Sequence, residues 1–113
     1  MVYEPVYERF EAAGPTGIRR AVEFKKSGFL AWGDQPELYF FRVEQEDAVG
    51  GISGDALRRF QRGRRYLSRE EKIDLAGLYL KQAIEAGKEL VSDNLLIRDE
   101  ELAGLAGPLG LLL

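Results

Sequence analysis

The chain has 113 residues, of which 45% are hydrophobic and 31% are charged, and its net charge is −3. That length suits one domain with its own core, and the composition is typical of a folded protein rather than a disordered one. Cysteine and histidine are absent, which excludes disulfides, thiolate nucleophiles and the commonest zinc ligands and general bases. We therefore expect a single globular domain over residues 1–113, with no metal or other cofactor.

No apolar run is long enough to cross a membrane, and the first residues lack the basic-then-apolar pattern of a signal peptide. We therefore expect a cytoplasmic protein with no membrane partner.

In chain order, the first predicted element is a short amphipathic helix over residues 5–13. Val6, Phe10 and Ala13 have helical spacing, and Gly14 ends the pattern.

From Ile18 the apolar period changes to two, with Val22 and Phe24 on the same face, which predicts a strand. A turn at residues 27–28 would bring the chain back as a second strand over residues 29–32.

The third predicted strand covers residues 38–44, after turn-forming residues 33–36. Both faces of this strand carry apolar side chains, so we expect it to be a central strand of the sheet or to be covered on both sides. One face carries Tyr39, Phe41 and Val43, and the other carries Leu38 and Phe40. Residues 46–51 are predicted to be a loop.

Ser53 is predicted to cap a helix that starts near Gly54 and ends at Gly63. Its buried side would consist of Ala56, Leu57 and Phe60.

A longer helix is predicted between Ser68 and Gly87. Ser68 and Glu71 have the spacing of a capping box, and Gly87 suits the left-handed residue after a helix. The apolar surface covers more than half of the helix circumference, so the helix is either sandwiched between two layers or shared with another chain. This surface comprises Ile73, Leu75, Ala76, Gly77, Tyr79, Leu80, Ala83 and Ile84.

After this helix, residues 90–91 and 95–97 are predicted to form a short strand or extended packing segments. A last helix over residues 100–106 would be capped by Asp99, and the apolar tail over residues 107–113 carries no clear structural signal. The predicted fold class is α+β: a small three-stranded antiparallel meander packed against the long helix, with shorter helices around it.

The charge distribution contains a basic cluster between two acidic stretches. Residues 56–66 carry five arginines and no acid, whereas residues 36–55 carry five acids and one arginine. The cluster consists of Arg58, Arg59, Arg62, Arg64 and Arg65, next to Tyr66.

Three interpretations of this cluster are open. Arginines suit bidentate recognition of phosphate or carboxylate, and aromatic neighbours can stack on nucleic-acid bases. The cluster could instead bind an acidic protein surface or a second copy of the chain. It could also be a solvated helix end that pairs with local acids. Arg58, Arg62 and Arg65 would share one face only if the helix continued through Gly63.

Leu78 lies on the otherwise polar face of the long helix, where we expect it to be exposed. Together with the wide apolar surface and the apolar tail, it would fit a surface used for association.

Two further motifs favour structural roles. The glycine-rich residues 50–54 lack the lysine and spacing of a phosphate-binding loop. The carboxylate clusters have no metal-binding or cleft-forming pattern around them and suit solvated helix starts and loop edges.

We therefore expect a small protein-interaction or regulatory module, with no enzymatic activity. It would engage a partner through its arginine-rich helix end and surplus apolar surface, and a homodimer is one option. The alternative is a nucleic-acid-binding protein that uses residues 58–65. A third class is an enzyme that works without histidine or cysteine.

Overall fold

The computed structural model describes residues 3–29 and 34–111, which form an α+β fold of five strands and three helices. The strands are β1 (Arg9–Ala13), β2 (Arg19–Phe29), β3 (Glu37–Val43), β4 (Glu46–Ile52) and β5 (Leu96–Ile97). The helices are α1 (Gly54–Gln61), α2 (Arg69–Glu85) and α3 (Asp99–Ala106), with a short 3-10 helix at Ser92–Asn94.

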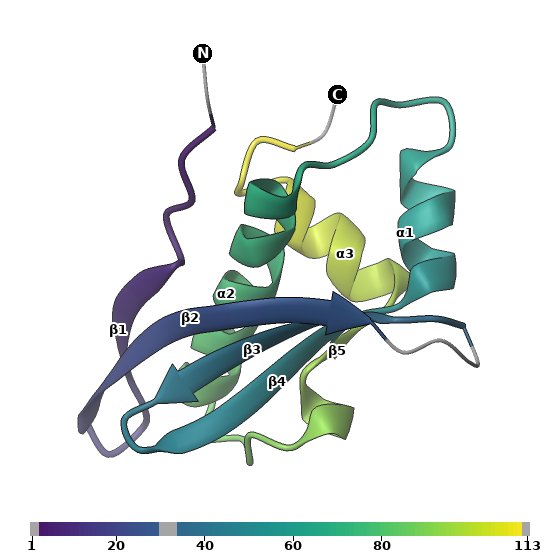
Figure 1. The fold of residues 1–113 in the computed structure, drawn as a ribbon. Coiled ribbons are helices and arrows are strands. Elements are labelled where there is room, and N and C mark those ends of the chain that lie inside the picture. The colour runs from purple at the N-terminus through teal and green to yellow at the C-terminus, as the bar shows by residue number, and fades with distance from the viewer. Residues whose placement is uncertain (1–2, 30–33, 112–113) are drawn as a thin grey trace.

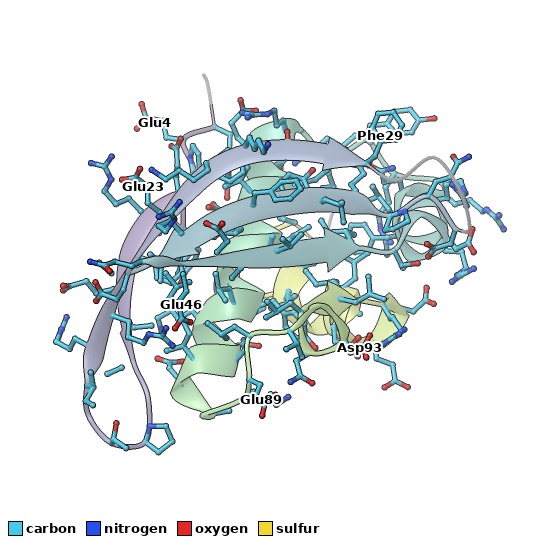
Figure 2. The ribbon with its side chains drawn as sticks, turned by 60° about the horizontal axis from the view of Figure 1, so that its bottom comes forward. Glu4, Glu23, Phe29, Glu46, Glu89 and Asp93 are labelled. Atoms are coloured by element: carbon cyan, nitrogen blue, oxygen red, sulfur yellow. The ribbon has the colours of Figure 1, made fainter. Side chains whose placement is uncertain are left out.

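The strands form one curled sheet in the order β1-β2-β3-β4-β5 (Figure 1). The first four are antiparallel, and β5 adds to β4 in parallel. The helices lie behind the sheet in Figure 2, and α2 packs against β1 and β4 on one side and against α3 on another. The α+β class and the packing of the sheet on the long helix are confirmed, but the sheet has five strands instead of the predicted three.

The long helix has the predicted ends. The Glu71 N–H donates to the Ser68 hydroxyl at 3.2 Å, and the Glu71 carboxylate accepts the Ser68 N–H at 2.8 Å. Gly87 has a φ of 70°, the left-handed conformation that glycine adopts without strain. Leu75 and Leu80 are at most 1% exposed, and the position of α2 between sheet and α3 explains why its apolar surface is so wide.

The predicted helix over residues 5–13 is wrong, because β1 occupies residues 9–13. Phe10 pairs with Val22 of β2, and Ala12 faces the core while Arg9 and Glu11 face solvent. The same residues therefore also have a period of two, and strand pairing decides between the two patterns.

The predicted turn at residues 27–28 is wrong as well. Ser27 and Gly28 lie inside β2, where they pair with Tyr39 and Leu38 of β3. Phe29 ends this strand, and the rest of the predicted second strand lies outside the described residues.

The predicted loop over residues 46–51 is in fact β4. Glycine weakens a strand prediction, but here it allows close packing. A Cβ atom on Gly50 would lie 3.3 Å from the Cβ of Ala76, tighter than most contacts between real Cβ atoms. Gly50 thus lets α2 lie close against the sheet.

Near the C-terminus, α3 begins at Asp99, but Arg98 is the N-cap residue and not Asp99 as predicted. The Arg98 N–H donates to the Glu101 carboxylate at 3.0 Å. The tail packs on its own domain as far as described, because Leu111 is only 2% exposed.

Residues 3–8, which we call the N-terminal strap, cross one face of α2. Asp74 on that face is fully buried and accepts the N–H groups of Val6 and Tyr7 at 3.1 and 2.7 Å, together with the hydroxyl of Tyr3. A Cβ on Gly77 would lie only 2.6 Å from the Cβ of Tyr7.

A second correction concerns the polar face predicted for the same helix. Leu78 was expected to be exposed, but it is 8% exposed and belongs to the core. Asp74 and Glu71, which defined the polar face in the sequence, are buried with it. Asp74 can be buried because the strap satisfies its carboxylate with backbone donors, and Glu71 because Arg65 and the Ser68 N–H bind its carboxylate.

Candidate partner-binding groove

The arginine cluster divides into different roles in the structure. Helix α1 ends at Gln61, and Gly63, with a φ of 75°, turns the chain away. The shared helical face for Arg58, Arg62 and Arg65 therefore does not exist.

Arg65 is an internal clamp. Its guanidinium donates to both oxygens of Glu71 at 2.7 and 2.5 Å, and this carboxylate is only 5% exposed. The hydrogen bonds from Arg65, assisted by those from Ser68, lower the pKa of Glu71 from 4.5 to about 2. Burial of the carboxylate acts in the opposite direction but is outweighed. Arg65 thus supports the start of α2.

Arg59 is a second clamp. Its Nε and Nη2 atoms donate to the two carboxylate oxygens of Asp99 at 2.9 and 2.7 Å, which joins α1 to α3. The pair is exposed, and Arg59 lowers the pKa of Asp99 through these hydrogen bonds.

Arg64 folds back on the last turn of α1. It donates to the carbonyl of Phe60 at 2.7 Å, and its guanidinium carbon lies 4.8 Å from the Phe60 ring centroid. Arg58 pairs only with the exposed Asp55 one turn earlier. Arg62 is exposed and forms no ion pair with any described residue.

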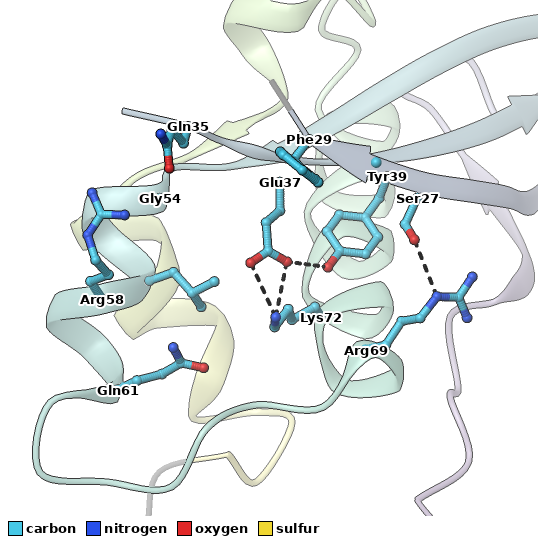
Figure 3. A pocket seen from close by; sticks show the side chains of 12 residues that line it. Ser27, Phe29, Gln35, Glu37, Tyr39, Gly54, Arg58, Gln61, Arg69 and Lys72 are labelled. Atoms are coloured by element: carbon cyan, nitrogen blue, oxygen red, sulfur yellow. Dashed lines mark hydrogen bonds and ion pairs between the residues drawn. The ribbon is translucent and has the colours of Figure 1, made fainter. Parts of the chain in front are cut away.

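Arg58 and Arg62 line a hollow that the sequence did not predict. A volume of about 590 Å³ lies between α1, the first turn of α2 and the adjoining ends of β2 and β3 (Figure 3). It adjoins a smaller hollow of about 230 Å³, with which it shares Arg58 and Gln61. We call the two together the basic groove.

The floor of the groove is a hydrogen-bonded trio. Glu37 accepts the hydroxyl of Tyr39 at 2.9 Å and the ammonium group of Lys72 at 3.0 and 3.3 Å (Figure 3). Glu37 and Tyr39 are two residues apart in β3 and therefore share a face, and Lys72 approaches from α2. Burial, followed by the charge of Glu37, raises the pKa of Tyr39, so the phenol stays protonated and donates.

The walls carry cations that have little or no carboxylate pairing. Arg69 donates from Nε to the Ser27 hydroxyl at 3.3 Å and lies over the Phe24 ring at 5.2 Å, without an ion pair among the described residues. Arg58 stands on the opposite side of the larger hollow (Figure 3), and Arg62 lines the smaller hollow.

Two exposed aromatic side chains stand at the groove. Phe29 at the end of β2 is 72% exposed and points into solvent (Figure 2), and Tyr66 is 82% exposed. Each lines one of the two hollows. Large exposed aromatics beside arginines are typical of surfaces that bind partners.

The predicted site residues are therefore only partly brought together. Arg58, Arg62 and Tyr66 share the groove, whereas Arg59, Arg64, Arg65 and Leu78 serve the fold.

The sequence analysis missed Phe29, Arg69 and Lys72. A local signal pointed to the last two, because a basic residue in the first turn of a helix opposes the helix dipole and needs another reason to be there.

Within residues 3–29 and 34–111, no three acidic side chains are grouped in a way that could hold a metal ion. None of the helices in this described part combines the length and apolarity required to cross a bilayer.

The chain was compared with models of protein families, with curated proteins and with solved structures, and none of them matches it. The groove therefore has to be interpreted from its own chemistry.

Proposed function

We propose that this protein is a protein-interaction module that binds an acidic, extended segment of a partner protein in the basic groove. One observation carries the proposal. Among the residues that the structure describes, four cations and one carboxylate line the groove, and that carboxylate, Glu37, is already paired with Lys72. The other three cations are Arg58, Arg62 and Arg69.

The charge of the groove opposes that of the whole chain. The described lining contributes a local charge of +3, four cations less one carboxylate, and Asp55, which pairs with Arg58, reduces it to +2 in a protein of net charge −3. Arginine forms bidentate hydrogen bonds with carboxylates and loses less solvation than lysine on binding. Phe29 and Tyr66 supply rigid apolar area for an aromatic or aliphatic anchor.

A nucleic acid is the second candidate, and the exposed aromatics beside the arginines favour it, since bases stack on such side chains. The distribution of charge argues for the protein partner. Nucleic-acid sites neutralise a long row of phosphates, whereas here the basic lining is confined to two adjoining hollows in an acidic protein.

An enzymatic function has less support in the same groove. The raised pKa of Tyr39 keeps the phenol protonated, so it is not available as a base, and the Lys72 side chain is engaged by Glu37 at 3.0 and 3.3 Å. Neither side chain is poised as a nucleophile.

The test is a titration of the protein against a fluorescein-labelled peptide that contains glutamates and one phenylalanine, and against a labelled oligothymidine. We expect the peptide to bind at low salt. The double variant Arg58→Gln/Arg62→Gln should weaken peptide binding by at least tenfold, because each lost charge-assisted bond contributes roughly 1–3 kcal/mol.

The matched control is Arg42→Gln/Lys88→Gln, which changes the net charge equally but leaves the groove intact. This control should keep the affinity within about twofold, since neither residue contacts the groove. Binding of oligothymidine with a steep salt dependence would instead establish the second candidate. If neither probe bound, the proposal would be rejected.

A further inference from the structure

Strand β1 forms one edge of the sheet and has an unpaired side. The Phe24 N–H donates to the Glu8 carbonyl at 2.7 Å. With the register of the two strands, this bond identifies which residues of β1 direct their backbone groups to β2. In an antiparallel pair, alternate residues direct their N–H and C=O groups to the neighbour and the others direct them away. The groups of Arg9, Glu11 and Ala13 therefore point away from β2, and no described residue bonds to them.

The side chains along this edge carry opposite charges. Arg9 is 80% exposed and Glu11 is 57% exposed, and both lie on the solvent face of the sheet. Their present partners, Glu23 at 2.9 Å and Arg19 at 3.0 Å, form exposed ion pairs. Such pairs contribute little to stability and can be shared with a new neighbour.

A second copy of the chain fits this edge in one register. If two β1 strands pair antiparallel about Phe10, Arg9 of each copy lies directly opposite Glu11 of the other. The backbone groups that point outward then meet in hydrogen-bonded pairs on both sides of the centre.

Other registers lack this match. A twofold axis at Glu11 would place the two glutamates opposite each other, which is unfavourable. An axis one residue further on would pair Glu11 with Ala13 and bring Arg9 opposite Pro15, which has no N–H to donate.

Phe10 supports the same arrangement. It is half-buried on the inner face, and its ring contacts that of Tyr7 edge to face at a centroid distance of 5.5 Å. About the proposed axis, Phe10 would lie opposite Phe10 of the second copy in the closely spaced type of cross-strand pair, where aromatic pairs stabilise a sheet.

We propose that two copies of this chain associate through β1, antiparallel about Phe10, into one continuous sheet with twofold symmetry. The interface is isologous, as most homodimer interfaces are. A short strand buries a small area, so the dimer is weak and forms only at high concentration. The β1 edge pairs with the first half of β2, whereas the groove lies at the far end of that strand near Phe29, so the two sites are separate (Figure 2).

The decisive experiment is sedimentation equilibrium from micromolar to near-millimolar concentration, with charge reversals on the edge. We expect the wild type to double its mass across this range. Arg9→Glu and Glu11→Arg should each remain monomeric, because like charges then face each other at both pairs. An equimolar mixture of these two variants should dimerise, because every pair across the axis is again opposite in sign.

A proline variant tests the backbone bonds without changing the charge pattern elsewhere. Glu11→Pro removes an N–H that points away from β2 together with the carboxylate of Glu11, so Glu11→Gln, which removes only the charge, is its control. Both monomers should keep melting temperatures near that of the wild type, and Glu11→Pro should dimerise less than Glu11→Gln. Thermal melts of the two charge variants check that both remain folded. A wild type that stays monomeric at all concentrations, or single variants that dimerise like the wild type, would overturn the proposal.

Discussion

The guanidinium of Arg65 binds both carboxylate oxygens of Glu71, the residue that also closes the capping box at the start of α2. A basic residue from the arginine cluster thus supports a helix start that would otherwise contain a buried, uncompensated charge. This pair separates the cluster into structural and available arginines, and the two kinds differ in what mutation does.

Replacing Arg65 with glutamine should destabilise the domain by about 2 kcal/mol. The variant leaves Glu71 buried with a weaker partner, and unpairing a buried charge is costly. The control is Arg62→Gln, which should change the free energy of unfolding by less than about 0.5 kcal/mol, since exposed and unpaired side chains contribute little. Urea unfolding of both variants checks the difference, and equal effects would contradict the assignment.

The same pair makes stability depend on pH. The pKa of Glu71 is lowered from 4.5 to about 2, so its contribution is complete above about pH 5 and is lost as the pH falls towards 2. The shift corresponds to at most about 3 kcal/mol. Glu71→Gln should remove this part of the acid sensitivity while the rest of the curve keeps its shape. Free energies of unfolding measured between about pH 6 and pH 2 should therefore show the wild type and the variant converging at low pH.

Two helical glycines should respond in opposite ways to alanine. In α2, Gly77→Ala would place a Cβ 2.6 Å from the Cβ and 2.7 Å from the carbonyl oxygen of Tyr7. The clash should cost about 1–3 kcal/mol, because the strap must move. In α3, a Cβ on Gly104 would meet nothing within 4 Å, so Gly104→Ala should stabilise the domain by about 0.5–1 kcal/mol. Melting temperatures that shift in the same direction would argue against the strap contact.

Aspartate at either of two leucines of α2 should unfold the domain. Leu80 is 1% exposed and Leu78 is 8% exposed, so both substitutions place an unpaired charge in the core at a cost of several kcal/mol. Leu78→Asp distinguishes the structure from the sequence pattern, which placed Leu78 on an exposed face where aspartate would leave folding intact and could abolish self-association. Circular dichroism at room temperature would detect the loss of fold, and a cooperative melt of Leu78→Asp near that of the wild type would refute the burial of this face.

Local interactions made parts of the fold predictable. Ser68 and Glu71 are three residues apart, and the capping box follows from that spacing alone. The strand β3 was predicted within one residue at each end because its alternation is unbroken. The strand β4 was not predicted, because its glycines weaken the strand pattern. The sequence does not show that Gly50 packs closely against Ala76 of α2, which is far away in the chain.

The candidate site was harder to predict because it depends on which charges meet. The sequence shows five arginines together, but not that Arg59 meets Asp99 or that the N–H of Val6 reaches Asp74. Only the unusual positions of Arg69 and Lys72 in the first turn of α2 were visible as a signal without the structure.

The N-terminal strap has a consequence for how the protein is made. Val6 and Tyr7 are synthesised before their acceptor Asp74, which lies 68 and 67 residues later in the chain. The hydrogen bonds between the strap and Asp74 can therefore form only after most of the domain has been synthesised. They are among the most non-local contacts of the fold and are expected to form late in folding. In a nascent chain that ends before residue 74, the faces of β1 and β4 on which α2 packs are still exposed. These faces are therefore expected to be binding sites for chaperones during synthesis.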